Sequence, residues 1–501
     1  MPASRHLFET VGLAALGGSF QFYNFGVVNL PQLVVQRWMN ETLYERDGTV
    51  LNQRQLDIRW SIFVSMISVG AIAGSLCVAF LTTFLGRKVS LLIASAANVL
   101  ACALFLIAKK VGYMEIMLAG RLLNGICVGL ASGIVPLYVT EIAPTRYRGA
   151  AGSVHQVAVL LGDFVSLLLP SAELLGTDEL WPVAFAITAI PSSCLVAYLP
   201  FTRESPSWLF IHKRDKELAR KAVEHFICGQ EAVETRMKEL ELESTLCSKM
   251  ERSFCSKLYR MFTKRELVAP FCMVLLVVCS QQFTAAPVVF SYSTYMFTQA
   301  GMDIWLAQKL TLGCGFLCFI TTLPAPILIE RLGRRRLSLI QQIGCLVVLF
   351  LFCLFEILRA NGFTSWTGYA IAVVILLYMG FYGLGSPIPW VLSSEMFSEE
   401  YRPVAVTLST TFIWLLCFVG TGLFLPLKHA IGLGYYFLFY VGCLVLVVLL
   451  TLLLLPETKN RSVAEIIAEY RRRKSSLATF TISGIHAAIS GIDVSHDPTT
   501  T

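Results

Sequence analysis

Apolar runs of about 20 residues constrain this chain more than any other feature. Six such runs precede residue 204 and six follow residue 265. A run of that length can cross a bilayer as a helix, and a lipid-embedded backbone must satisfy its own hydrogen bonds, as a helix does. A soluble core cannot absorb twelve of them. The sequence therefore predicts an all-α membrane protein with twelve transmembrane helices in two pseudo-symmetric six-helix bundles.

The composition sets the same bound on the class of protein. Hydrophobic residues make up 55% of 501 positions, charged residues 15%, and the mean hydropathy is +0.66, as in polytopic membrane proteins. The net charge of +7 is small and predicts no nucleic-acid partner. Most of the fifteen cysteines sit in apolar runs without ligand spacing, so we predict buried thiols and no metal or cofactor. No nucleophile–base pair or phosphate loop indicates an enzyme.

One polar interval, residues 204–265, divides the chain. Charges recur there every three or four residues, which is typical of surface helices. We expect a first bundle at 1–200, an aqueous helical linker at 201–265, a second bundle at 266–456 and a tail at 457–501. The tail turns to Ser, Thr and Gly and should be disordered after about residue 475.

The expected helices follow the apolar runs. In the first half they cover residues 7–28, 60–84, 89–108, 116–139, a fifth segment ending near 169, and 182–199. In the second half they cover 268–295, 305–329, 337–357, 368–392, 404–425 and 435–455. The interval 37–57 reads as a polar loop.

Three landmarks recur at nearly one spacing. The turn at Gly86 recurs at Gly333, an offset of 247 residues; Glu141 recurs at Glu395, offset 254; and Glu204 recurs at Glu457, offset 253. Such self-similarity indicates an internal duplication. Two parallel six-helix halves place a substrate site between them near the midplane of the membrane.

The distribution of cations predicts the orientation. Most Lys and Arg residues lie on one side of the expected helices, together with the linker and the tail. By the positive-inside rule, both termini and the linker are cytoplasmic. The sequon at Asn40 then lies outside, where it is a candidate glycosylation site. We expect an integral membrane protein of the plasma membrane.

Several motifs together resemble one family. The turns Gly86-Arg87-Lys88 and Gly333-Arg334-Arg335, the pair Gln281-Gln282, the run Pro387-Ile-Pro-Trp390 and Pro456-Glu-Thr-Lys after the last helix resemble the facilitative hexose transporters. These are the sugar-porter branch of the major facilitator superfamily. The resemblance covers roughly residues 7–470 and implies alternating access, in which two bundles rock about a central sugar.

The resemblance also implies a set of sugar-contacting residues, to which we add two candidates inside the helices. Amide side chains both donate and accept hydrogen bonds without a charge to desolvate, and Trp offers an apolar face and one donor. Sugar hydroxyls need both functions. The candidate substrate-binding residues are Gln156, Gln281, Gln282, Trp390, Trp414, Asn24 and Tyr292.

This chain departs from the family's glucose carriers at several pocket positions. Where those carriers usually have Asn or an acid, it has Pro287, Cys318, Ile413 and Tyr382. The cavity should be less polar, so glucose need not be the best ligand, and Pro287 should break its helix.

Two further residues inside the expected helices bear on whether transport is coupled to protons. Asn24 stands where proton-coupled relatives place an acid, and an amide cannot titrate, which favours uniport. Asp163, two turns after Gln156, stands where the family usually has an apolar residue. A midplane acid is a functional candidate, so substrate contact, proton coupling and a structural role all stay open for Asp163.

The charged residues at the cytoplasmic helix ends should act as a gate. Ion pairs between them would hold the inner side closed, and a few kcal/mol decides which way a carrier rests. The candidate gate residues are Arg87, Glu141, Arg148, Glu204, Arg334, Glu395, Arg402 and Glu457.

Three functions remain open from the residues. The first is a carrier for a hexose or a related small polyol. The second is the same fold carrying urate or another organic solute, or coupling sugar to protons. The third is a non-transporting sugar sensor. The sequence predicts a small-molecule sugar and the lipid bilayer as partners, and does not fix the oligomeric state.

Overall fold

The computed structural model describes residues 4–48, 50–144, 147–248, 254–362, 366–397 and 401–457. Within these ranges every regular element is a helix, so the predicted all-α fold is confirmed. The expected tail beyond Glu457 lies outside the described residues.

The described residues of the first half form nine α-helices, α1 to α9, and two short 3-10 turns, η1 and η3. Their bounds are α1 Arg5–Gly18, η1 Ser19–Phe22, α2 Tyr23–Gly26, α3 Gln32–Asp47, α4 Gln53–Phe84, α5 Arg87–Val111, α6 Met114–Ile142, α7 Arg148–Leu168, α8 Trp181–Ala186, α9 Ala189–Tyr198 and η3 Leu199–Phe201.

The linker and the second half follow. The linker helices are α10 Pro206–Ile211, α11 Lys216–Phe226, α12 Gln230–Ser248 and α13 Phe254–Thr263. The second half consists of α14 Arg265–Phe283, α15 Ala286–Gln299, α16 Ile304–Thr322, α17 Ala325–Leu332, α18 Arg334–Ala360, α19 Thr367–Gly385, α20 Ile388–Glu395, α21 Arg402–Ile431 and α22 Leu433–Leu454.

Ten helical stretches of the described residues are long and apolar enough to cross a membrane. The two other predicted segments have structural reasons to fall short. The first is divided among α1, η1 and α2, where the polar residues Gln21 and Asn24 interrupt the run. The fifth is α7, whose apolar part, Val154–Leu168, is shorter than the rest.

Four further predicted continuous helices are broken in the structure. The segment 268–295 divides at Ala285, which has a left-handed φ of 66°, and Pro287 lies in the first turn of α15. The break expected from Pro287 is therefore confirmed. The segments 305–329 and 368–392 divide at Pro324 and Pro387, because a proline lacks an N–H donor and clashes with the preceding turn. The segment 182–199 divides between α8 and α9.

The predicted loop 37–57 is wrong, because most of it is helical. In α3, Val35, Met39 and Leu43 are buried at a spacing of four residues, which is a helical face hidden among charges. The start of α4 is fixed by a capping box in which the side chains of Asn52 and Gln55 bond each other's backbone N–H at 2.9 and 3.0 Å.

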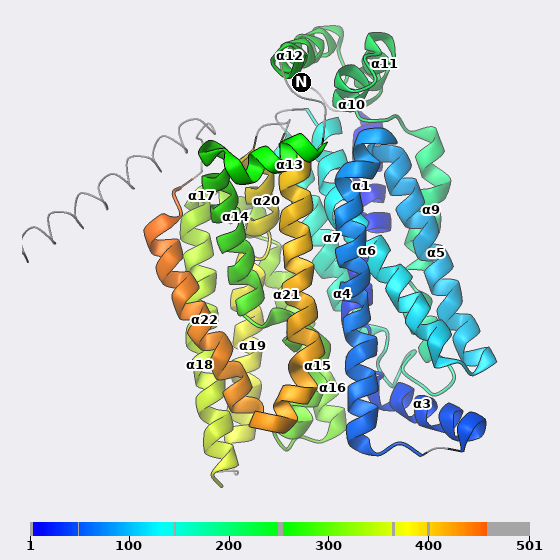
Figure 1. The fold of residues 1–501 in the computed structure, drawn as a ribbon, viewed down its shortest axis with the longest axis vertical. Coiled ribbons are helices and arrows are strands. Elements are labelled where there is room, and N and C mark those ends of the chain that lie inside the picture. Colours follow the sequence, from blue (N-terminus) through cyan, green and yellow to red (C-terminus); the bar gives the residue numbers. More distant parts are fainter. Residues whose placement is uncertain are drawn as a thin grey trace, which may run out of the picture.

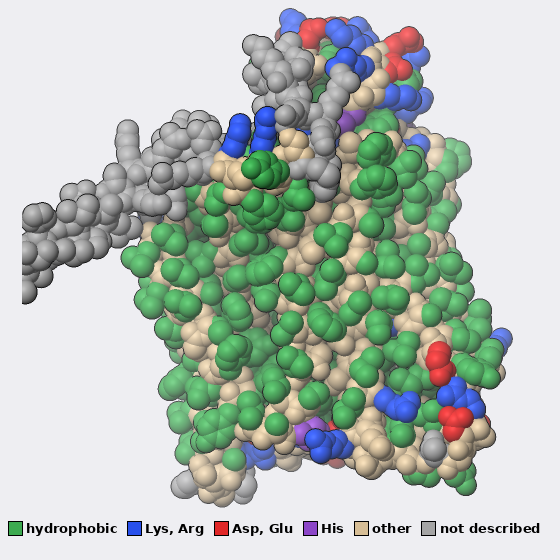
Figure 2. Space-filling view, in the orientation of Figure 1, with side chains coloured by type: hydrophobic (Ala, Val, Ile, Leu, Met, Phe, Trp, Pro, Cys, Tyr) green, Lys and Arg blue, Asp and Glu red, His purple; other side chains and the backbone are tan. Residues whose placement is uncertain are grey.

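The two halves stand side by side, with α4 and α21 at their junction (Figure 1). Helices α10 to α12 lie at one end of the molecule, here called the linker side, and α3 lies at the other, here called the α3 side. The N-terminus is on the linker side, since the Ser4 N–H donates to the Phe226 carbonyl at 3.0 Å. Figure 2 shows hydrophobic side chains over the middle of the molecule and charged ones gathered toward both ends.

Close helix packing depends on small residues. A Cβ atom on Gly70 would meet the Leu122 carbonyl, and one on Gly125 would meet the Ile67 carbonyl. Only glycine lets α4 and α6 approach this closely. Across the halves, the Ser75 and Thr411 hydroxyls are 2.9 Å apart, which joins α4 to α21.

Candidate functional site

An aromatic cluster joins the two halves at their centre. The ring centroid of Phe22 in η1 lies 5.7 Å from that of Trp414 in α21 and 6.3 Å from that of Trp390 in α20. The His155 ring of α7 lies 5.8 Å from Trp390, and its Nδ1 is 2.6 Å from the Ser19 hydroxyl. The break at η1 directs Phe22 toward the second half. Sequence reasoning missed Phe22, because one apolar residue in an apolar run carries no signal.

The three predicted glutamines carry unpaired polar atoms. Gln156 of α7 is 5% exposed and Gln281 of α14 is 6% exposed. The Oε1 atoms of both, and that of Gln282, are buried without a partner among the described residues. The Gln281 amide donates to the Gly385 carbonyl at 3.2 Å, which holds it at the break between α19 and α20. Buried polar groups are normally satisfied, so these oxygens indicate a place for a ligand.

Asp163 lies on the same face of α7 as Gln156. Seven residues separate them, which is two turns or about 10 Å along a helix axis. The Asp163 carboxyl is 8% exposed, and its Oδ1 has no partner among the described residues. It lies close to Cys318 of α16 and Tyr382 of α19. An acid of the first half thus faces two positions of the second half at which the sequence lacks the family's usual amide and acid.

Asn24 bonds within its own half through its Nδ2, and Tyr292 lies where the second half meets Ser61 of α4. The Asn24 Nδ2 donates to the Thr188 hydroxyl at 3.2 Å, and the backbone carbonyl of Asn24 accepts a hydrogen bond from the Arg121 guanidinium. The Asn24 Oδ1 is buried without a partner among the described residues. The Tyr292 hydroxyl donates to the Thr421 carbonyl at 3.4 Å. The structure therefore places Asn24 in a polar network of the first half and Tyr292 against α21.

On the α3 side, one amide ties the halves together. The Nδ2 of Asn29 donates to the Phe290 carbonyl at 2.6 Å and to the Ser293 hydroxyl at 2.8 Å. Its Oδ1 accepts from the Thr294 N–H at 3.1 Å. Asn29 is 2% exposed, so these three bonds are shielded from water. They hold α15 against the end of α2 and close the α3 side.

Two contacts between side chains add to this closure. The His429 Nε2 of α21 lies 3.0 Å from the Asp57 Oδ2 of α4, and the Asp57 Oδ1 accepts from Gln53 at 3.0 Å. Lys309 of α16 pairs with Glu173 at 2.6 Å. Each of these two pairs joins one half to the other, so with Asn29 the α3 side is closed at three places.

On the linker side, a buried ion pair lies within the first half. The Arg87 Nη2 of α5 is 2.8 Å from the Glu141 Oε1 of α6, and both residues are buried. The Ser205 hydroxyl donates to the second Glu141 oxygen. This arrangement satisfies the carboxylate and ties α5 and α6 to the start of α10.

Glu204 and Glu457 occupy equivalent places in the two halves. The Glu204 carboxyl accepts from the N–H groups of Arg87 and Lys88, both at 3.0 Å. The Glu457 carboxyl accepts from the N–H groups of Arg334 and Arg335, at 2.9 and 3.3 Å. Each carboxylate thus caps a helix N-terminus, where unpaired donors and the helix dipole favour a negative charge.

The glycines before these helices make room for the caps. Gly86 and Gly333 have φ values of 90° and 87°, and a Cβ on either would collide with the capping carboxyl. Burial raises the pKa of the Glu204 carboxyl, against the effect of its backbone hydrogen bonds. The same cap in both halves supports the inferred duplication.

The other predicted gate residues are only partly described. Arg402 donates to the Phe397 carbonyl at 3.5 Å, at the start of α21. The side chains of Arg148 and Glu395 lie outside the described residues. Asn40, the sequon residue, lies in α3. Its Oδ1 accepts a hydrogen bond from the Leu51 N–H at 3.0 Å.

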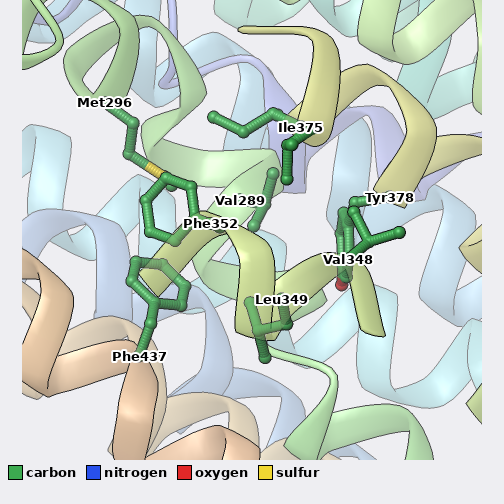
Figure 3. Close-up of a pocket in the computed structure, with 9 residues that line it drawn as sticks. Val289, Met296, Val348, Leu349, Phe352, Ile375, Tyr378 and Phe437 are labelled. Carbon is green, nitrogen blue, oxygen red and sulfur yellow. The ribbon is translucent and has the colours of Figure 1, made fainter. Parts of the chain in front are cut away.

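A separate cavity lies inside the second half (Figure 3). Its lining comes from α15, α18, α19 and α22 and is apolar except for Tyr378, whose hydroxyl donates to the Thr284 carbonyl at 2.9 Å. No free polar group of this lining can bind a polyol. Among the described residues, no three His, Cys, Asp or Glu side chains gather as a metal site.

Residues 10–470 match the family described as "Sugar (and other) transporter". The chain is 32% identical over 452 residues to facilitated glucose transporter member 3 of Canis lupus familiaris, covering 90% of this chain and 89% of the relative. It is 34% identical over 475 residues to member 4 of Mus musculus, covering 93% and 91%, and 33% identical over 459 residues to member 5 of Equus caballus, covering 91% and 90%.

The fold is similar to that of solved structures of a proton:xylose symporter. XylE bound to 6-bromo-6-deoxy-D-glucose matches with a TM-score of 0.76 at 22% identity, covering 93% of this chain and 99% of that chain. The inward open XylE from E. coli matches with a TM-score of 0.68 at 22% identity, covering 92% and 99%. This protein belongs to the sugar transporter family and has the major facilitator fold.

Proposed function

We propose that this protein moves a hexose or a related small polyol across the membrane by alternating access, as a facilitative uniporter. The observation that carries the proposal is a set of buried, unpaired polar atoms on helices of both halves. Four are acceptor oxygens, on Gln156, Gln281, Gln282 and Asp163, and the Trp414 Nε1 is an unpaired donor. The relatives named above are called facilitated glucose transporters.

This donor and acceptor balance favours one class of solute. An acceptor oxygen is satisfied only by a ligand that donates, and every sugar hydroxyl can donate. An organic anion such as urate would bring further negative charge toward Asp163. The excess of unpaired acceptor oxygens therefore disfavours an anionic solute. The rings of Trp390, Trp414 and Phe22 offer apolar faces for the C–H surface of a pyranose.

The contacts that close the two ends of the molecule would let the site open to one side of the membrane at a time. With the α3 side closed by Asn29 and the Asp57–His429 pair, a bound sugar would leave toward the linker side. Opening of the α3 side requires α15 to leave α2, and the break at Ala285 lets α15 move without the whole of α14. The Arg87–Glu141 pair and the Glu204 and Glu457 caps, with their predicted partners at Arg148, Arg334, Glu395 and Arg402, would set the balance on the other side.

Uniport is favoured over proton coupling by Asn24. An amide cannot carry a proton between the two faces, and that of Asn24 is held by Thr188. Proton-coupled sugar transport remains the second candidate, because the unpaired carboxyl of Asp163 is an ionisable group between the halves.

The proposed orientation follows the cations. The linker side would face the cytoplasm, and the α3 side with Asn40 would face outward, in the plasma membrane. We also propose that residues 1–200 and 266–456 are the two moving bundles and that residues 201–265 link them.

Uptake into proteoliposomes tests the proposed function. Labelled glucose, fructose, galactose and urate are supplied with and without an imposed pH gradient. Hexose uptake that does not depend on the gradient supports uniport. Accumulation driven by the gradient and lost in Asp163→Asn would establish proton coupling instead, and uptake of urate alone would overturn the sugar assignment.

A further inference from the structure

We propose that α13 is a membrane-surface helix. Its aromatic side chains Tyr259 and Phe262 enter the lipid leaflet on the linker side, and its cations bind the headgroups of anionic phospholipids there. The inference concerns a surface outside the candidate sugar site and does not depend on transport.

The apolar surface of α13 is larger than the part that the protein covers. Met261 is fully buried, and Leu258 packs with it against the core of the second half. Tyr259 and Phe262, which lie beside that buried face on the helix, are 70% and 59% exposed. An exposed patch of large apolar side chains marks a surface that binds a partner.

The position of α13 puts this patch at the edge of the bilayer. Figure 1 shows α13 lying across the linker-side ends of α14 and α21. The helix ends at Thr263, and the membrane-spanning stretch that follows begins at Leu267, so at most about 14 Å of chain separates the two. The end of α13 therefore lies at the depth of the lipid headgroups.

Phe262 touches the membrane-spanning stretch itself. Its ring centroid is 5.7 Å from that of Phe271, which lies inside the stretch Leu267–Gln299. Because more than half of Phe262 is uncovered by protein at that contact, the uncovered part faces lipid. Tyr259, three residues earlier, lies on the same side of the helix, and its hydroxyl can stay among the headgroups while its ring contacts apolar chains.

The cations of α13 complete the pattern. Lys257 and Arg260 lie on the side of the helix opposite Phe262, and Lys264 follows its last turn. Among the described residues, no acid pairs with Lys257 or Lys264. Figure 2 shows Lys and Arg side chains along the upper edge of α13 and hydrophobic side chains below it. An aromatic face backed by Lys and Arg is typical of helices that lie in the interface and prefer anionic lipids.

A phospholipid leaflet fits this surface better than a second protein does. The exposed aromatic patch continues onto a transmembrane stretch through the contact of Phe262 with Phe271, where lipid is the only neighbour available to an outward-facing side chain. The proposed orientation also turns the linker side to the cytoplasm, and the cytoplasmic leaflet carries the anionic lipids.

Photo-crosslinking in the full chain tests the lipid contact. Benzoylphenylalanine replaces Phe262, or Tyr259 as an independent second position, and the protein is reconstituted into vesicles of equal parts phosphatidylcholine and phosphatidylserine. Irradiation should give lipid adducts at both positions, measured by the intact mass of the protein. The same probe in place of Leu242 of α12, which is 64% exposed and lies farther from the bundles, should give none.

The identity of the adducts tests the role of the cations. A Lys or Arg near an anionic surface corresponds to about a fivefold gain in affinity, so adducts with phosphatidylserine should outnumber those with phosphatidylcholine by at least that factor. In Lys257→Gln combined with Lys264→Gln this preference should fall about fivefold or more, while the total yield of adducts stays the same because the aromatic side chains remain. The matched control, Lys213→Gln combined with Lys238→Gln, removes the same charge from exposed lysines outside α13 and should keep the preference.

Lipid adducts at neither position, with crosslinks to protein or none at all, would overturn the assignment of α13 to the membrane surface. A preference for phosphatidylserine that is absent in the wild type, or unchanged in the double lysine variant, would overturn the assignment of the cations to anionic headgroups.

Discussion

Substitution of Asn29 by Ala should open the α3 side. The side chain makes three hydrogen bonds to α15, at 2.6, 2.8 and 3.1 Å, all between the halves. Each bond contributes about 1 kcal/mol net, so the closed state loses about 3 kcal/mol, while the freed groups are hydrated when the side is open. Since 1.4 kcal/mol corresponds to tenfold, the ratio of closed to open should fall by about a hundredfold.

Labelling from outside measures this shift. A cysteine placed at Ser291 of α15, which is fully buried in the closed state, becomes accessible to a membrane-impermeant maleimide only when α15 leaves α2. We expect faster labelling in Asn29→Ala and no change in the control Gln299→Ala. Gln299 accepts from Lys428 at 3.2 Å within the second half. Equal labelling of Asn29→Ala and the wild type would refute the assignment of Asn29 as the closing residue.

Three further predictions concern the scaffold. Arg87→Leu leaves Glu141 buried without its cation and should cost about 3–5 kcal/mol, seen as a lower Tm in detergent; a Tm equal to that of the wild type would contradict the pairing. Gly125→Val should abolish folded protein in size-exclusion chromatography, whereas Gly12→Ala, which has open space around it, should not; a monodisperse Gly125→Val protein would show that α4 and α6 can separate. Burial lowers the pKa of His225, whose carbonyl accepts from Ser4, so docking of the N-terminus should persist at neutral pH and weaken as the pH falls below the ordinary histidine value of about 6.5. A lower protection factor against hydrogen exchange in α1 at pH 5 than at pH 7.5 would show this, and equal protection factors would exclude it.

The parts of the fold that follow from length and repetition were predictable. Twelve apolar runs give the helix pattern, and the recurrence of Gly86 and Glu204 at Gly333 and Glu457 marks two halves with one plan. The structure shows the physical reason for that recurrence, because each glutamate caps the helix that follows the glycine. A cap that uses the same glycine and glutamate in each half can be recognised as a repeat in the sequence.

The features that depend on contacts between distant segments were not predictable. Nothing near Asn29 indicates that its amide bonds residues 290–294, and an apolar residue such as Phe22 shows no sign that it meets Trp414. The helix α3 was hidden because its charges dominate the pattern, while its buried face consists of only a few residues. Breaks at prolines were readable at Pro287 and overlooked at Pro324 and Pro387, where the flanking apolar runs concealed them.

The residues of the candidate site divide in the same way. Gln156 and Gln281 stand out as amides in apolar helices, and their unpaired oxygens agree with the predicted role. Asn24 and Tyr292 stand out equally in the sequence, yet the Asn24 Nδ2 and the Tyr292 hydroxyl each bond a neighbour in their own half. Polarity inside a membrane marks a buried contact, and only the packing decides whether a ligand or a neighbouring helix provides it.

Counterflow tests the central claim most directly. Proteoliposomes are loaded with unlabelled hexose and diluted into a trace of labelled hexose, with no pH gradient. A carrier that alternates about one site accumulates the label transiently above its outside concentration, and this overshoot should be lost when Gln156, Gln281 and Gln282 are replaced together by Leu. Uptake that never exceeds equilibrium, or an overshoot that survives the triple substitution, would contradict a chamber lined by these amides and opened alternately to the two sides.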